Sequence, residues 1–307
     1  MTEQERLTRI HPNLSRRAEL FDLTRRFFRE RDFLEVETPV RTPAVAPEVN
    51  IDPVESDGWY LITSPELHMK RLLAAGYERI FQISRCFRRA ERGRLHNPEF
   101  TLLEWYRAGA DYLDVIQDTE QLLLFLAVNL YHTTEINYQG QQIDLTPPWK
   151  HLSIRQAYLD CVGWDPIEAY DARRFDDDMA LKVIPSLPIS QPVILKDYPK
   201  EAASLARLKS NDNTLAERAE VFIGGLEIAN AYSELNNRKE QTWRFSEEAT
   251  LIEKTRGKRT PLPQSFLEAI GHMPPAGGIA LGLDRLTMLL CNASAIDEVL
   301  AFTVDTA

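Results

Sequence analysis

Strand signals in this sequence come in pairs towards both ends, with helical segments between them. Residues 80–88 alternate apolar with polar side chains, and residues 100–106 do the same after the turn-rich stretch ERGRLHNP, which predicts an antiparallel hairpin. Strand patterns return from residue 217 in EVFIGGLEIANAYSEL and again in the glycine-rich GGIALG. This order favours an α+β fold, an antiparallel β-sheet flanked by helices, over an alternating βαβ series.

Helical patterns fill the remaining sequence. An amphipathic helix is predicted from Ser15, a candidate N-cap, to Arg31, followed by a strand in FLEVETPV that should end, or lie at a sheet edge, at Pro39. Further helices are predicted over residues 66–76, 111–130 and 241–254. Prolines punctuate residues 131–217, which predicts an inserted helical subregion with short pieces such as 154–161 and 200–208.

Composition excludes several classes of protein. The chain has 307 residues, a net charge of -10 and three widely spaced cysteines, which argues against a disulfide framework or a zinc knuckle. It has no apolar run long enough for a membrane span or a secretory signal, so we expect a cytoplasmic protein that does not contact membranes. The acidic balance also disfavours a generic nucleic-acid binder.

Arginine is the candidate phosphate ligand, because the sequence has no GxxxxGK[ST] loop and no GxGxxG opening. Strand parity puts Arg88 on a polar face with Gln82, Ser84 and Cys86, where a guanidinium can grip phosphate or carboxylate bidentately. A solvated surface arginine is the ordinary alternative. On the next strand Phe100, Leu102, Glu104 and Tyr106 share a face, which suits a flat ring and an ammonium group.

Towards the C-terminus, Asn230, Tyr232 and Glu234 share one strand face, whereas Glu227 has the opposite parity. A bend or bulge would have to bring Glu227 round to join them. With that bulge, Glu220 and Glu227 could share Mg²⁺ that bridges ATP phosphates. Arg285, at the start of a helix, suggests a nearby anion, the alternative being an ion pair with Asp284 or Glu298.

Three ordered motifs resemble those of class II aminoacyl-tRNA synthetases. FFRERDFLEVETPV resembles motif 1, FRRAERGRLHNPEFTLLEWY resembles motif 2, and GGIALGLDRLTML resembles motif 3. With SPELHMKRLL and GGLEIANAYSELNN, the chain is most similar to lysyl-tRNA synthetases. The resemblance implies a catalytic domain over residues 12–307, with the insertion at 131–217 and an extension at 1–11, and it leaves no room for an anticodon-binding domain.

The chain is similar to the stand-alone paralogs that lysylate elongation factor P, including Ala280 where synthetases usually have glycine. This implies ATP, Mg²⁺ and lysine or β-lysine as ligands, elongation factor P as the acceptor, and a homodimer. Catalysis would depend on Arg88 and Arg285, and Mg²⁺ on Glu220 and Glu227. The implied ATP-binding residues are Arg88, Arg89, Ala90, His96, Asn97, Phe100, Glu227, Ile228, Gly282 and Arg285. The implied amino-acid pocket is Ser64, Pro65, Glu66, Glu104, Tyr106, Asn230, Tyr232, Glu234 and Ala280.

Three positions depart from the family pattern. Motif 2 usually reads Arg-x-Glu, whereas Ala90 stands at the glutamate position and Glu91 follows one residue later, so a bulge would be needed for Glu91 to serve. Ala231 and Asn237 replace the usual glycine and aspartate, with Ala231 expected to reshape the pocket slightly and Asn237 to lie in a turn.

Two alternatives stay open. A truncated synthetase could charge tRNA or another RNA, although the acidic charge and the missing module make tRNA an unfavoured partner. A catalytically silent paralog could bind lysine as a regulator, with Ala90 as its main support.

Overall fold

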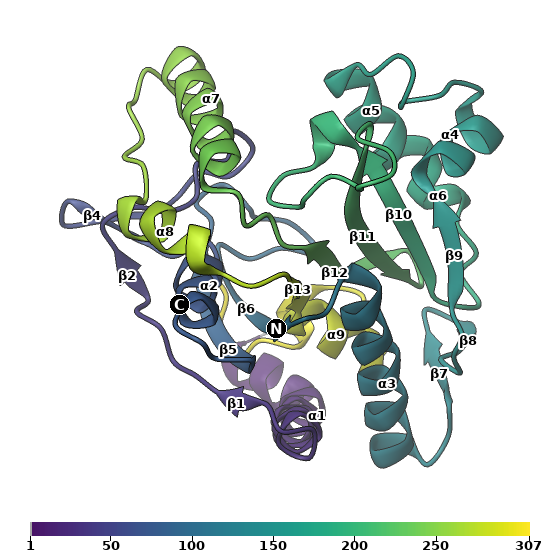
Figure 1. Cartoon of the computed structure of the whole chain (residues 1–307). Helices are drawn as coiled ribbons and strands as arrows, with labels where there is room; N and C mark the ends of the chain where they lie inside the picture. Colours follow the sequence, from purple (N-terminus) through teal and green to yellow (C-terminus); the bar gives the residue numbers. More distant parts are fainter. Residues whose placement is uncertain (1) are drawn as a thin grey trace.

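The computed structural model describes residues 2–307 and is built on one eight-stranded sheet (Figure 1). The strand order is β1-β5-β6-β13-β12-β11-β10-β9, and all neighbours are antiparallel except β1 with β5 and β10 with β9. Its strands are β1 (Leu34–Glu35), β5 (Arg79–Phe87), β6 (Glu99–Ala108), β9 (Lys150–Ser153), β10 (Val193–Pro199), β11 (Leu215–Ile223), β12 (Leu226–Ser233) and β13 (Ala276–Gly282). The predicted hairpin and α+β class are confirmed.

Two small sheets accompany the large one. The first has the order β2-β4-β3, and the second is the hairpin β7-β8. Their strands are β2 (Arg41–Thr42), β3 (Glu55–Ser56), β4 (Trp59–Leu61), β7 (Glu135–Tyr138) and β8 (Gln141–Asp144).

Helices cover the large sheet unequally on its two faces. They are α1 (Glu3–Arg29), α2 (Glu66–Ala74), α3 (Tyr112–Tyr131), α4 (Ile154–Val162), α5 (Ala172–Asp178), α6 (Ile184–Ser186), α7 (Arg238–Arg256), α8 (Gln264–Ala269) and α9 (Leu283–Leu290). A π-helical turn covers Met179–Val183, and 3-10 turns cover Lys200–Ala202, Ile270–His272 and Ile296–Glu298. Every helix within residues 2–307 is too short or too polar to span a bilayer.

The main core lies on one face of the sheet. There α1, α3 and α9 pack their apolar side chains against fully buried residues such as Phe81 and Trp105. On the opposite face two smaller cores lie apart: α2, α7 and α8 pack at one end, and α4 and α5 at the other (Figure 1). The middle of that face therefore carries polar side chains without helical cover.

Helix α1 begins much earlier than the sequence indicated. Thr2 is its N-cap and forms a capping box with Glu5, and the helix continues through Pro12. The prediction of Ser15 as N-cap is therefore wrong, because a good capping box upstream competes with a local signal and tolerates one proline. The proposed domain start at residue 12 falls inside this helix.

Residues 131–217 are less helical than predicted. They contain the hairpin β7-β8 and the sheet strands β9 and β10, and Lys200–Ala202 is only a 3-10 turn, although α4 matches the predicted piece at 154–161. Strand β10 was not predicted, because its apolar run has only three residues, Val193 to Leu195, and lies between Pro192 and Pro199. These three residues are buried because β10 pairs with β11, which is distant in the sequence. The strand predicted in FLEVETPV shrinks to β1, which does lie at the sheet edge.

Candidate active site

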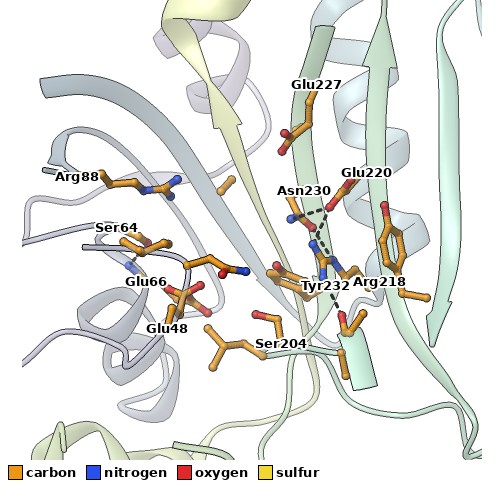
Figure 2. Close-up of a pocket in the computed structure, with 18 of the residues that line it drawn as sticks. Glu48, Ser64, Glu66, Arg88, Ser204, Arg218, Glu220, Glu227, Asn230 and Tyr232 are labelled. Carbon is orange, nitrogen blue, oxygen red and sulfur yellow. Dashed lines mark hydrogen bonds and ion pairs between the residues drawn. The ribbon is translucent and has the colours of Figure 1, made fainter. Parts of the chain in front are cut away.

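A cavity of about 880 Å³ opens over the uncovered middle of the sheet. Its floor is formed by β6, β13, β12 and β11, and its walls include α7 and the loop that precedes β3. Figure 2 shows Arg88, Ser64, Glu66 and Glu48 on one side and the β11 and β12 side chains on the other. Segments more than 150 residues apart in the sequence thus meet in one site.

Two rows of directly paired residues make the floor. The first runs from Gln82 through Glu104, Ala280 and Asn230 to Glu220. The second row lies two residues away from the first on each strand. It runs from Ile80 through Tyr106, Gly278 and Tyr232 to Arg218. Since side chains alternate between sheet faces, both rows lie on the face that carries the cavity, and their members on β6, β12 and β11 line it. The predicted face-sharing on β5, β6 and β12 is confirmed.

A β-bulge brings Glu227 to the same face. The register of β11 with β12 shifts between Val221 and Phe222, so that β12 has one extra residue at that point. Ile228 and Ala229 consequently both contact the main core, and Glu227 lines the cavity together with Asn230. The bulge that the parity of Glu227 required is therefore present.

Carboxylates dominate one end of the cavity. Glu104 accepts hydrogen bonds from Ser64 Oγ (2.7 Å) and Tyr106 Oη (2.9 Å), and burial raises its pKa to about 7. Glu66 and Glu234 both contact the fully buried ammonium of Lys70, with 2.5 Å between Lys70 Nζ and Glu234 Oε2. Burial raises the pKa of Glu234, and Lys70 opposes that rise. Three carboxylates thus face one internal cation, which leaves this end able to receive another.

Gly278 makes room for these groups. A Cβ atom at this position would lie 2.1 Å from Glu234 Oε1 and 2.4 Å from the Tyr106 ring. Any larger residue would displace both side chains. Two residues on, Ala280 places a methyl group on the floor between Glu104 and Asn230.

Arg88 presents a buried donor to the cavity. It follows the last residue of β5, its guanidinium lies 5.0 Å from the centre of the Phe100 ring, and Nη1 is 3.3 Å from Glu91 Oε1. Its Nε is buried without a hydrogen-bond partner among the described residues. A buried donor of this kind is costly, so its position favours an incoming anion.

The loop after β5 turns two of the predicted ATP-binding residues away from the cavity. Arg89 is exposed and pairs with Asp52, and Ala90 is exposed in a turn. Glu91, one residue later, does line the cavity. The sequence predicted that a bulge would be needed for Glu91 to take the place of Ala90. A turn, and not a bulge, brings Glu91 to the cavity.

Arg285 links the loop between β5 and β6 to strand β12. Its Nη1 donates to the main-chain oxygen and to Oε2 of Glu227 (3.0 and 3.2 Å), and Nη2 lies 2.5 Å from His96 Nε2. Burial and Arg285 together lower the pKa of His96, so Nε2 acts as an acceptor. The alternative partners are wrong: Asp284 pairs with Arg17 at 2.6 Å, and Glu298 accepts from Ser294.

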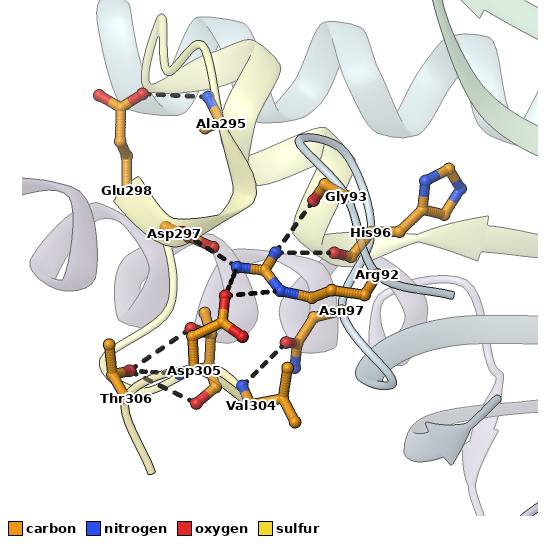
Figure 3. Close-up of polar contacts among 11 residues, drawn as sticks. Arg92, Gly93, His96, Asn97, Ala295, Asp297, Glu298, Val304, Asp305 and Thr306 are labelled. Carbon is orange, nitrogen blue, oxygen red and sulfur yellow. Dashed lines mark hydrogen bonds and ion pairs between the residues drawn. The ribbon is translucent and has the colours of Figure 1, made fainter. Parts of the chain in front are cut away.

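The C-terminal segment holds the same loop from outside (Figure 3). Asn97 Oδ1 accepts from the main-chain N–H of Val304 (3.1 Å), and its Nδ2 donates to the Glu99 oxygen (2.7 Å). Arg92 pairs with Asp297 and Asp305. Asn97 is therefore fixed in place before any ligand binds.

Glu220 and Glu227 are suitable ligands for a divalent cation, but they do not form a closed metal site. Arg218 Nη2 donates to Glu220 Oε1 (2.6 Å), and Asn230 Nδ2 contacts the same oxygen (3.3 Å). No group of three or more potential ligands occurs within residues 2–307. Two carboxylates fit a magnesium ion that takes its other ligands from phosphate and water.

Comparison with known proteins identifies the family. The model for tRNA synthetases class II (D, K and N) matches residues 4–306. The chain belongs to this family.

Relatives within it share nearly the whole length. The elongation factor P (R)-β-lysine ligase of Salmonella typhi is 36% identical, with 96% of each chain covered. The protein of the same name from Salmonella paratyphi A is 35% identical over the same shares.

Most residues that the resemblance to this family implied do line one cavity. Those that do not are Pro65, Arg89 and Ala90. Ala231 is fully buried in the main core on the opposite face, so the expectation that it reshapes the pocket is wrong. Asn237 is the N-cap of α7, where its side chain accepts from Lys239 and Glu240.

Sequence reasoning missed three charged residues of this synthetase-like site. Arg218 stacks on Tyr198 and Tyr232, with its carbon Cζ 4.5 and 5.7 Å from the ring centres. The sequence could have indicated Arg218, because it lies two residues before Glu220 and so shares a strand face with it. Lys70 lies four residues after Glu66 on a helix, which was another such indication. Glu48 lies in a proline-rich loop that has no periodicity to read.

Proposed function

We propose that the chain uses ATP to activate (R)-β-lysine or lysine as an aminoacyl-adenylate, and that it transfers the aminoacyl group to a lysine side chain of elongation factor P. The names of the two Salmonella relatives support both substrates. An acceptor of this kind would place the reaction in the cytoplasm.

The observation that carries the proposal is that one cavity presents both arginines and a cluster of buried carboxylates. The arginines are Arg88 and Arg285, and the carboxylates are Glu66, Glu104 and Glu234. Lysine and β-lysine each have a carboxylate and a side-chain ammonium at opposite ends. Such a molecule would place its ammonium near Glu104 and Glu234 and its carboxylate near Arg88.

The reaction needs positioning and charge neutralisation. The amino-acid carboxylate attacks the α-phosphorus of ATP, an oxygen-phosphorus bond forms, and pyrophosphate leaves. We assign Arg88 to the α-phosphate and the carboxylate, Phe100 and Asn97 to adenine, and Arg285 with His96 to the γ-phosphate. Mg²⁺ at Glu220 and Glu227 would neutralise phosphate charge. Cys86 is fully buried with a raised pKa, so it is unsuited to be a nucleophile.

Intact-mass measurement tests the proposal most directly. The protein is incubated with ATP, one lysine isomer and purified elongation factor P, and amide formation should add one lysyl mass to the factor. Exchange of pyrophosphate into ATP should depend on the same isomer. Transfer to tRNA but not to the factor would favour the RNA-charging alternative, and no exchange with any isomer would favour the regulatory one.

A further inference from the structure

Glu48 is a carboxylate in the cavity that the proposed function leaves without a role. It lies in the loop between β2 and β3, lines the cavity, and is drawn in Figure 2 on the same side as Glu66 and Arg88. Within residues 2–307 its carboxylate forms neither a hydrogen bond nor an ion pair, whereas Glu66, Glu104 and Glu234 each have a partner. An unpaired carboxylate in a cavity is costly unless a ligand uses it.

The loop around Glu48 is held firmly. Val49 N donates to Glu248 Oε2 (2.9 Å), Arg256 Nη1 donates to the Ile51 oxygen (3.0 Å), and Ile51 N donates to the Glu48 oxygen (3.1 Å). Helix α7 therefore fixes this loop from outside. The Glu48 side chain is consequently presented to the cavity from a fixed main chain.

Charged groups from four elements face Glu48. They are Arg88 after β5, Glu66 on α2, Glu248 on α7 and Arg218 on β11. Burial raises the pKa of Glu48 to about 7; Arg88 and Arg218 oppose this, and Glu66 and Glu248 add to it. A carboxyl group of this kind exchanges protons near neutral pH, where general bases are most effective.

The second half-reaction has a proton to remove. A lysine side chain has a pKa of about 10.4, so the acceptor amine arrives as an ammonium ion. The activation step needs no proton removal, because its nucleophile, the amino-acid carboxylate, is already deprotonated. If Arg88 holds the α-phosphate and the amino-acid carboxylate, as proposed above, the reacting carbonyl lies on the side of the cavity that Glu48 shares.

We infer that Glu48 is the general base that accepts a proton from the acceptor ammonium during aminoacyl transfer, an inference that rests on the proposed function. One proton passes from the ammonium nitrogen to the Glu48 carboxylate. The neutral amine then attacks the carbonyl carbon, a carbon-nitrogen bond forms, and the bond from that carbon to the phosphate oxygen breaks. AMP leaves, and the second proton on nitrogen passes to solvent.

The variant Glu48→Gln separates the two half-reactions. Pyrophosphate exchange should keep its rate and its KM for the amino acid, which also shows that the variant is folded. Single-turnover transfer from preformed adenylate to elongation factor P should fall roughly 100-fold. In the unchanged protein, transfer should rise with pH and level off above about pH 7, whereas in Glu48→Gln it should start far lower and keep rising with the fraction of uncharged amine. The matched control is Glu253→Gln, which removes the same charge from an exposed position on α7 outside the cavity.

Hydroxylamine provides a second readout, because it is largely uncharged at neutral pH and needs no base to release its lone pair. Glu48→Gln should form the hydroxamate from the adenylate as fast as the unchanged protein does. Equal transfer to elongation factor P by both proteins would overturn the inference, as would an increased KM for the amino acid with transfer unaffected, which would make Glu48 a substrate-binding group. Failure of the unchanged protein to form adenylate would instead refute the proposed function.

Discussion

Arg88 combines partial burial with an unsatisfied donor, which a solvated surface arginine does not. Arg88→Ala should lower the rate of pyrophosphate exchange at least 100-fold, because the transition state loses a donor that neutralises charge at phosphorus. Its melting temperature should change little, since within residues 2–307 the Arg88 guanidinium interacts only with Glu91 and the Phe100 ring. Arg85→Ala is the control, an exposed arginine on β5 outside the cavity. Equal losses in both variants would contradict the assignment.

Glu104 should make amino-acid binding depend on pH. Its pKa is raised to about 7 by burial and by Glu66, against hydrogen bonds from Ser64 and Tyr106 and the charge of Lys70. Below that pH an ammonium ligand must first displace the proton, so affinity should rise up to about tenfold per pH unit towards pH 7 and level off above it. Calorimetry in two buffers of different ionisation enthalpy should show proton release below pH 7. An affinity that is flat from about pH 6 to pH 8 would contradict this.

Strand periodicity explains which site residues could be predicted. Glu104, Tyr106, Asn230, Tyr232 and Glu234 were placed correctly on one face because alternation is a local property of a strand. Residues in loops have no such rule. Glu48 was therefore missed, and the loop after β5 gave no local sign that Arg89 and Ala90 would turn outward.

At the level of elements, the sequence predicts features that depend on neighbouring residues, such as caps and turns. It does not predict strands that are buried only by pairing with distant segments. The capping box of α3, Asp111 with Asp114, and the glycine turn between β11 and β12 agree with their sequences. Gly224 and Gly225 both have positive φ, as a two-residue hairpin turn requires. Strand β10 is buried only because distant β11 and β9 flank it, which no local window contains.

The C-terminal segment is an element whose contacts predict a role in ATP binding. Removing residues 303–307 would release Asn97 from the Val304 N–H and Arg92 from Asp305. Loss of one hydrogen bond costs about 1 kcal/mol, so the KM for ATP should rise about fivefold while the chain stays folded. Steady-state exchange assays check this, with Asp305→Asn as the milder comparison because that ion pair is solvent-exposed. An unchanged KM for ATP in the truncated chain would show that Asn97 needs no such support.

At the scale of the whole molecule, the charge distribution matches the site. The first third of the chain is nearly neutral and carries Arg88 and the arginine-rich loop, whereas the acidic excess lies in the remainder. The net charge of -10 disfavours tRNA, because affinity for nucleic acid comes from lysines and arginines that neutralise phosphates. A protein acceptor is consistent with the net negative charge, provided that the surface around the cavity is complementary in charge to that acceptor.

The predicted homodimer can be tested at the sheet edge. Strand β1 has only two residues and ends the large sheet beside α1, and Leu34 and Val40 there are 51% and 42% exposed. Exposed apolar groups at an open edge favour burial against a second copy. Light scattering at micromolar concentration should give twice the mass of the 35.3 kDa chain.

Leu34→Glu should shift the protein towards the monomer, because it would bury a charge in that interface. Leu181→Glu is the matched control, since Leu181 is 73% exposed and lies in the π-helical turn after α5, away from β1. A monomeric unchanged protein would refute the dimer. A Leu34→Glu variant that stays dimeric would show that any interface between copies lies elsewhere on the molecule.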